Sequence, residues 1–189
     1  MTCLMSHMKK GWIWLWPVFL VLAATCCPVF GADVNTLIRS LSDPNPNTRY
    51  QAVKNLGHMG RSAAPAVPAL VKALEDDDRR IMKEAMLALR SIGGPAVPAL
   101  IKALSHAQHD VREQAALALG KMGPPANQAI PALVKILDDT NRRVVDAAEY
   151  ALRSIGHPAL PALKRRAAQG GPGAEIAGKL IKKIDPGAK

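Results

Sequence analysis

Histidine and carboxylate side chains are the groups of this sequence that could bind a metal ion or carry protons. His106 and His109 are three residues apart and Asp110 follows them directly, in a predicted turn. Imidazole and carboxylate groups are common ligands of divalent cations, but the favoured interpretation is a solvated turn. The sequence contains no Ser-His-Asp arrangement, no glycine-rich phosphate loop and no Cys-x-x-Cys motif. It therefore predicts no catalytic, cofactor-binding or metal-binding residue.

Cysteine and aromatic residues are concentrated at the start of the chain. All three cysteines, Cys3, Cys26 and Cys27, precede position 33, so the remainder can form no disulfide and offers no thiol nucleophile. Beyond position 32 the aromatic residues are reduced to Tyr50 and Tyr150. A core built from aliphatic side chains and alanine favours close-packed helices over a sheet.

The first 32 residues have the pattern of a signal peptide. Lys9 and Lys10 form a basic segment, an uncharged stretch of 22 residues follows, and the small residues Gly31 and Ala32 suit a cleavage site. We expect residues 1–32 to be removed and the rest of the chain to be exported, either to the periplasm or as a secreted protein. Because the uncharged stretch is long enough to cross a bilayer, an uncleaved membrane anchor is the alternative.

A sequence motif recurs along the rest of the chain. An aliphatic residue followed by Pro-Ala-Leu occurs four times, and a glycine precedes each copy. The prolines are Pro68, Pro98, Pro131 and Pro161, and the glycines are Gly60, Gly93, Gly123 and Gly156. The spacings alternate between 30 and 33 residues, which indicates a longer period of 63. We infer that a two-repeat segment was duplicated.

Each repeat is predicted to consist of two helices. The proline opens the first helix, where its missing N–H costs nothing, and an Asp- or Asn-rich turn then caps the second helix, which ends at the glycine. One such unit buries too little apolar surface to fold alone, so neighbouring units must stack. The prediction is an all-α superhelix, or α-solenoid, of about five two-helix repeats over residues 33–185. A disordered tail is expected at residues 186–189.

The combined pattern resembles HEAT repeats. It joins a Pro-opened helix, an Asp-bearing turn and a second helix that ends in Leu-Gly-x-Met-Gly, as at 119–123, or in Leu-Arg-Ser-Ile-Gly, as at 89–93. More narrowly, it is similar to the short HEAT-like class first named for phycobilin lyase subunits. That class includes scaffolds, bilin lyases and the metal-dependent deoxyhypusine hydroxylase, so the resemblance implies the fold and leaves the function open among them.

The sequence departs from both enzyme types of that class. The hydroxylase relatives carry His-Glu pairs as iron ligands, whereas none of His58, His106, His109 and His157 precedes a glutamate. A bilin lyase must enclose a large tetrapyrrole, and only two aromatic residues remain beyond position 32. The favoured function is an exported, non-catalytic scaffold or adaptor that binds another protein. The alternative is a subunit or a relative of a HEAT-like enzyme, of the bilin lyase or the metal-dependent hydroxylase type.

Two faces of the predicted array are the candidate binding surfaces. In such arrays the second helices commonly line the concave side, where apolar groups suit a protein partner; the alternative is that the leucines are simply buried between helices. The partner-binding residues predicted on this face are Lys54, Leu87, Leu117, Tyr150, Arg80 and Arg143. A basic ladder places one cation on the first helix of every unit, at Arg39, Lys72, Lys102, Lys135 and Arg165. The alternative interpretation is that these cations only keep the outer face of the array soluble.

Half of the net charge of +10 lies at the C-terminal end, where residues 164–189 hold seven basic and two acidic side chains. This end is the predicted electrostatic contact with an anionic surface, through Lys164, Arg165, Arg166, Lys179, Lys182 and Lys183. The body of the array is only mildly basic. The sequence therefore predicts no specific nucleic-acid partner.

Overall fold

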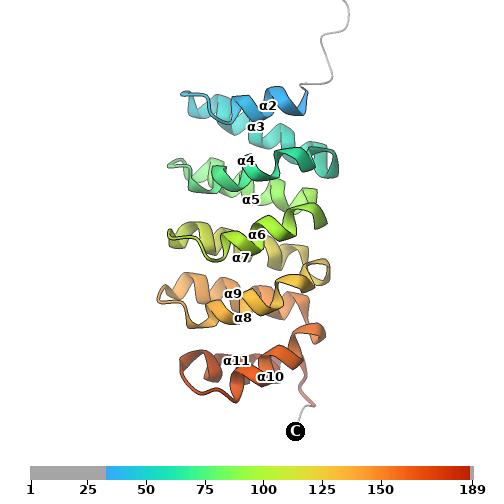
Figure 1. The fold of residues 1–189 in the computed structure, drawn as a ribbon, viewed down its shortest axis with the longest axis vertical. Coiled ribbons are helices and arrows are strands. Elements are labelled where there is room, and N and C mark those ends of the chain that lie inside the picture. Colours follow the sequence, from blue (N-terminus) through green and yellow to red (C-terminus); the bar gives the residue numbers. More distant parts are fainter. Residues whose placement is uncertain (1–32, 188–189) are drawn as a thin grey trace, which may run out of the picture. The chain divides into compact units, whose positions relative to one another are not determined.

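The computed structural model describes residues 33–187 of the chain as a stack of helix pairs (Figure 1). Within this range the chain forms helices and turns without a strand. The predicted all-α solenoid is therefore confirmed. The predicted signal peptide, residues 1–32, and positions 188–189 of the predicted tail lie outside the described residues.

Each repeat unit consists of a short first helix and a longer second helix. The first helices are α2 (Val34–Ser40), α4 (Val67–Lys72), α6 (Val97–Ala103), α8 (Ile130–Lys135) and α10 (Leu160–Ala167). The second helices are α3 (Pro46–Met59), α5 (Arg79–Ile92), α7 (His109–Met122), α9 (Arg142–Ile155) and α11 (Pro172–Ile184). In Figure 1, α4, α6 and α8 lie in front of the second helices α5, α7 and α9. Within residues 33–187 these helices form five units, which we number from the N-terminal end.

The second helices begin at side-chain caps, as the turn composition predicts. Asn45, Asp78 and Asn141 accept a hydrogen bond from the backbone N–H two residues later, at 2.9 Å in each case, and so begin α3, α5 and α9. Helix α7 starts after Gln108 without a side-chain cap. Four second helices end at the motif glycines, whose φ angles of +53° to +79° are favourable for residues without a Cβ.

Short 3-10 segments connect the helices, and these were not predicted from the sequence. They are η1 (Gly60–Ala66), η2 (Ala73–Glu75), η3 (Gly94–Ala96), η4 (Pro124–Ala129), η5 (Ile136–Asp138) and η6 (His157–Ala159). Most contain proline, whose missing N–H interrupts the regular α-helical hydrogen bonds and leaves the tighter turn as a local solution. The motif proline stands at the second position of α4, one residue later than predicted.

One hydrophobic core runs continuously through the stack, from Leu37 in α2 to Leu180 in α11. The motif leucines of successive first helices, Leu70, Leu100, Leu133 and Leu163, are all 0% exposed. Alanines of the second helices, such as Ala85, Ala115 and Ala148, are also fully buried and let neighbouring helices pack closely. The units are therefore parts of a single body, because each one completes the core of its neighbours.

Two glycines bring second helices into unusually close contact. A Cβ added to Gly57 of α3 would lie 3.3 Å from the Cβ of Ala88 in α5. A Cβ added to Gly120 of α7 would lie 2.7 Å from Cδ1 of Tyr150 in α9. The equivalent residue of α5 is the exposed Arg90, so the joint between α5 and α7 lacks this contact. We call the contact between two successive units a joint. Joints with a close contact between second helices therefore alternate with a wider one, and this alternation has the same 63-residue period as the sequence.

Candidate functional site

The predicted partner-binding column occupies equivalent positions on four successive second helices. Leu87 of α5 is 36% exposed and is the one large hydrophobic residue that is classed as exposed among the described residues. Lys54, Leu117 and Tyr150 are half-buried. Leu117 packs against the core, and the ring of Tyr150 lies where Gly120 leaves room for it. The column exists as a surface feature, and Leu87 is its most accessible apolar member.

The two arginines predicted on the same face make local contacts. Arg80 donates from Nη2 to Asp78 Oδ2 at 2.7 Å, and its guanidinium carbon lies 5.8 Å from the ring centroid of Tyr50. Arg143 pairs with Asp110 at 3.3 Å and with Glu113 at 2.7 Å. Hydrogen bonds from Arg80 lower the pKa of Asp78. Both cations are thus partly neutralised by carboxylates of their own or the preceding unit.

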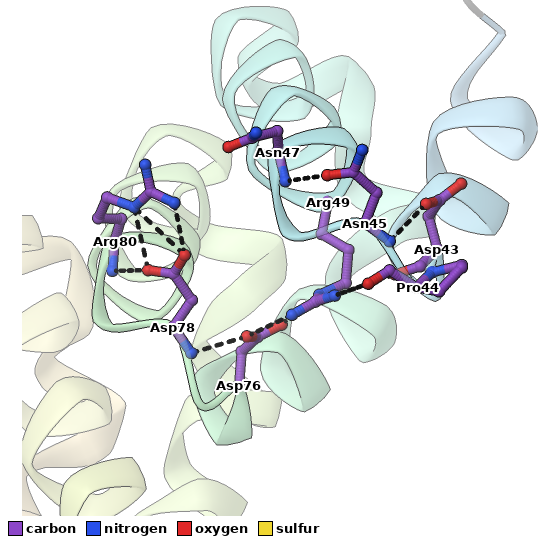
Figure 2. A network of polar contacts seen from close by, with 8 residues as sticks. All are labelled: Asp43, Pro44, Asn45, Asn47, Arg49, Asp76, Asp78 and Arg80. Atoms are coloured by element: carbon purple, nitrogen blue, oxygen red, sulfur yellow. Dashed lines mark hydrogen bonds and ion pairs between the residues drawn. The ribbon is translucent and has the colours of Figure 1, made fainter.

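A recurrent polar contact at the N-terminal ends of the second helices joins consecutive units (Figure 2). Arg49 of unit 1 donates from Nε to Asp76 Oδ2 at 2.7 Å and from Nη2 to Asp76 Oδ1 at 2.9 Å. Its Nη1 donates to the backbone carbonyls of Asp43 and Pro44 at 3.0 and 3.2 Å. The guanidinium therefore holds its own turn and the turn of the next unit together. We call this arrangement a turn clamp.

A second turn clamp has the same geometry in the duplicated half of the array. Arg112 donates to the two carboxylate oxygens of Asp139 at 2.7 and 2.8 Å, and to the carbonyls of His106 and Ala107 at 2.9 and 2.8 Å. Each arginine and its aspartate are 63 residues from the corresponding partner in the other clamp. Sequence reasoning missed both clamps, although the 63-residue period relates Arg49 to Arg112 and Asp76 to Asp139.

The clamp arginines stabilise the ionised aspartates. A side-chain hydrogen bond from Arg49 lowers the pKa of Asp76, and the equivalent bond from Arg112 lowers the pKa of Asp139. In both cases a backbone N–H two residues later adds a further hydrogen bond to the carboxylate, at 2.9 Å. Both carboxyls therefore favour the charged form, which is the form that holds the two turns together.

The joint between units 2 and 3 has no turn clamp. Met82 and His106 occupy the positions of the clamp arginine and aspartate. His106 Nδ1 accepts the N–H of Gln108 at 3.2 Å, as the aspartates do at the other joints, and its Nε2 lies 3.4 Å from Glu75 Oε1. A cleft of about 270 Å³ opens here beside Met82 and His109.

The described residues offer no set of three His, Cys, Asp or Glu side chains arranged to hold a metal ion. His109 Nε2 lies 3.6 Å from Asp110 Oδ1, and His106 contacts a different carboxylate. The structure therefore does not bring the two histidines and Asp110 together as one ligand set. No helix between residues 33 and 187 has the length and apolarity that crossing a bilayer requires.

The basic ladder lies on the first-helix face. Its members Arg39, Lys72, Lys102, Lys135 and Arg165 are all exposed, and none forms an ion pair with a carboxylate of residues 33–187. At the C-terminal end, Lys164, Lys179, Lys182 and Lys183 are exposed as well. Arg166 differs, because its side chain is 12% exposed and bonds Asp138 and the carbonyl of Gly170. Arg166 therefore stabilises the C-terminal end of the array through contacts within the chain.

Comparison with solved structures shows likeness to other helical repeat proteins. The complex of CpcE and CpcF of phycocyanin lyase from Nostoc sp. PCC7120 is 26% identical, with a TM-score of 0.53, over 85% of this chain and 68% of that chain. A structure described for microtubule plus end tracking by XMAP215, CLIP-170 and EB1 is 20% identical, with a TM-score of 0.65, over 84% and 77%. A TOG domain of crescerin is 20% identical, with a TM-score of 0.52, over 82% and 68%.

The family comparison covers most of the described array. No curated protein matches the chain. The HEAT-repeat profile matches twice, over residues 34–119 and 97–174, and the two matches overlap in the middle of the stack. Together with the paired helices, the motif prolines and the closing glycines, this match shows that the chain belongs to the HEAT-repeat family.

Proposed function

We propose that the chain is an exported, non-catalytic adaptor that binds another protein through the face formed by its second helices. HEAT repeats present long helical surfaces that suit protein–protein interaction. Arg49, Arg112 and Arg143 are engaged in turn clamps and ion pairs between units, and these contacts serve the stack itself. Binding of a partner is the function that such a surface supports best.

The observation that carries the proposal is the exposure of Leu87. Fully burying a leucine side chain contributes about 2 kcal/mol, so the 36% exposure of this residue leaves part of that free energy for a partner. Leu87 is not isolated, because the half-buried Leu117 and Tyr150 hold the equivalent positions on the next two second helices. An apolar column with charged neighbours such as Lys83 and Arg90 has the composition of an interface centre and its rim.

Photo-cross-linking from defined positions tests the proposed surface. A photoreactive phenylalanine derivative replaces Leu87 in the full chain, expressed in the native host, and the matched control replaces the exposed Gln128 of η4. We expect a discrete adduct with one protein from position 87, identified by mass spectrometry, and no such adduct from position 128. The Leu87→Asp variant should then bind that purified protein at least tenfold more weakly, at unchanged helicity. Equal adduct patterns from both positions would refute the assignment of this face.

Export is the second part of the proposal, and it rests on the sequence of residues 1–32. Lys9 and Lys10 precede an uncharged stretch that ends in small residues. We propose cleavage near Ala32 and a periplasmic or secreted location. Fractionation of the host followed by N-terminal sequencing tests this. A mature protein that starts near Asp33 supports export, whereas an intact N-terminus in the membrane fraction supports the uncleaved anchor.

The second candidate function is a subunit of a HEAT-like enzyme. The 26% identity to the phycocyanin lyase complex favours it. Two measurements separate this candidate from the adaptor: the metal content of the purified protein, and its absorption spectrum after incubation with a bilin. Stoichiometric iron or a bound chromophore would favour the enzyme subunit. A spectrum unchanged from that of free bilin, together with trace metal only, would favour the adaptor.

A further inference from the structure

The basic ladder has a feature that a simple solvating surface does not require. Its five cations are exposed, one per unit, and none pairs with a carboxylate of residues 33–187. Elsewhere the same chain pairs its arginines closely: Arg49, Arg112 and Arg166 each bind an aspartate through two nitrogens. The first-helix face therefore keeps one unpaired cation per unit available to a ligand, at equivalent positions along the stack.

Three ladder residues border shallow clefts between successive first helices. Lys72 lines a cleft of about 330 Å³ between α2 and α4, and Lys135 lines one of about 540 Å³ between α6 and α8. Arg165 lines a smaller cleft of about 190 Å³ between α8 and α10. An alanine three residues before each cation, Ala69, Ala132 or Ala162, lies in the same cleft, and its small side chain leaves the room. A ligand can therefore place side chains beside the cations.

The spacing of the ladder restricts the shape of a ligand. Packed helices are about 8–10 Å apart, so one cation follows the next at about that interval. A polyproline II segment advances about 3.1 Å per residue with three residues per turn, which puts every third side chain on one face about 9 Å apart. An extended peptide with an acidic residue at every third position would therefore meet one cation per unit.

A carboxylate at the edge of this face distinguishes such a peptide from a continuous polyanion. Glu75 and Asp138 are exposed at equivalent positions, 63 residues apart, close to the ladder. Asp138 is paired with Arg166, so Glu75 is the one of the two that repels a ligand whose charge is uniform, such as nucleic acid or a sulfated glycan, or a plane of anionic headgroups. A peptide with neutral residues between its carboxylates can pass these positions without a like-charge contact.

From these observations we propose that the first-helix face binds an extended acidic peptide segment, one carboxylate to each ladder residue. This surface is separate from the second-helix face of the proposed function, so the two can be occupied together. A carboxylate beside each of Lys72, Lys102, Lys135 and Arg165 forms an exposed ion pair. Each such pair is weak, but several pairs formed by one rigid ligand add up to a measurable binding affinity.

Peptide binding to the purified full chain tests the proposal. The probe is a fluorescent peptide of four Glu-Pro-Pro triplets, and the comparison peptide has the same composition with its four glutamates contiguous. We expect anisotropy titrations at low salt to give at least tenfold tighter binding of the spaced peptide, with affinity falling as salt rises. Equal binding of the two peptides would overturn the proposal, because it would show attraction to charge without recognition of spacing.

Matched variants locate the binding surface. Lys102→Gln and Lys135→Gln should each weaken binding of the spaced peptide two- to fivefold, and the double variant by the product. Lys179→Gln and Lys182→Gln remove the same charge from α11 and should change binding less than twofold. Equal losses in both pairs would overturn the proposal. Thermal melting by circular dichroism accompanies each titration, because the five ladder cations lie in the last turn of their helices and stabilise them. A lowered Tm with unchanged affinity would also overturn the proposal.

Two other polyanions test whether the ladder binds a different class of ligand. Phosphatidylglycerol vesicles and a single-stranded oligonucleotide are titrated against the same four variants. We expect weaker binding than that of the spaced peptide, without a difference between ladder and α11 variants. Tighter binding of either probe that is lost specifically in the Lys102→Gln and Lys135→Gln variants would identify a different class of ligand and refute the peptide.

Discussion

Arg112 and Asp139 form a two-point hydrogen bond between units 3 and 4, and the pair of Arg49 and Asp76 repeats it between units 1 and 2. The side chains of Arg112 and Asp139 are only 15% and 8% exposed. A bidentate contact with so little solvent is one of the stronger polar contacts available to a protein. Its position between consecutive turns makes it a contact between units.

Substituting Arg112 should destabilise the array more than substituting an exposed arginine. The Arg112→Met variant leaves the carboxylate of Asp139 without its partner and frees two backbone carbonyls. We expect a loss of about 2–3 kcal/mol in the free energy of unfolding, measured with urea. The control is Arg142→Met, whose 74% exposed side chain pairs on the surface with Asp146, and its cost should stay below about 1 kcal/mol. Similar losses in both variants would contradict this role.

The clamp aspartates should make the stability of the array sensitive to acid. Both have a pKa in the folded state below the ordinary carboxyl value of about 3.9. Their contribution is therefore complete above that value and is lost as the pH falls through it towards the lowered pKa. Urea unfolding at pH 7, 5, 4 and 3 should show the loss in the last steps, and the Asp76→Asn, Asp139→Asn double variant should lose less over that range. An equal decline in both proteins would assign the acid sensitivity to other groups.

Transferring a turn clamp to the joint between units 2 and 3 should stabilise the array. The Met82→Arg, His106→Asp double variant copies the residues of the two clamped joints, and the acceptor role of His106 towards the N–H of Gln108 passes to the new carboxylate. We expect the double variant to exceed the sum of the single variants by about 1 kcal/mol in urea unfolding. A coupling of zero would mean that the second joint is too wide for the contact.

Adding a methyl group at the close helix contacts should have graded effects. The Gly120→Ala side chain would meet Tyr150 at 2.7 Å and Cα of Ala151 at 2.9 Å, so we expect a loss of about 1–3 kcal/mol. Gly57→Ala meets Ala88 at 3.3 Å and should cost less. Gly178→Ala in α11 has nothing within 4 Å and should gain about 0.5–1 kcal/mol from helix propensity. Thermal unfolding of the three variants checks the order, and a different order would contradict the close joints.

The helix pairs could be predicted because their signals are local. Pro68, Asn45 and Gly60 act on the backbone within a few residues of themselves. The structure places Asn45 and Gly60 where these preferences predict, and Pro68 one residue later. The exposure of the ladder residues follows from the same helical period. The turn clamps could not be assigned in the same way, since Arg49 and Asp76 are 27 residues apart and meet only after two units have stacked.

The exposure of the candidate partner surface could not be predicted from the sequence either, for the same reason. Spacing alone puts Leu87, Leu117 and Tyr150 in one column, but their exposure depends on the helix on either side. Tyr150 is partly covered because Gly120 allows its ring to approach α7. Leu87 stays open on a helix whose equivalent of that glycine is Arg90. Such differences between equivalent positions depend on which residues face each other across a joint.

The alternation of clamped and unclamped joints also restricts how such a chain can change its length in evolution. Loss of unit 2 alone would set Arg49 opposite His106, and insertion of one unit between units 1 and 2 would separate Arg49 from Asp76. Unequal recombination in steps of two units preserves every pairing. An ancestral gene could therefore have lengthened or shortened in pairs without passing through a protein that carries an uncompensated charge at a joint.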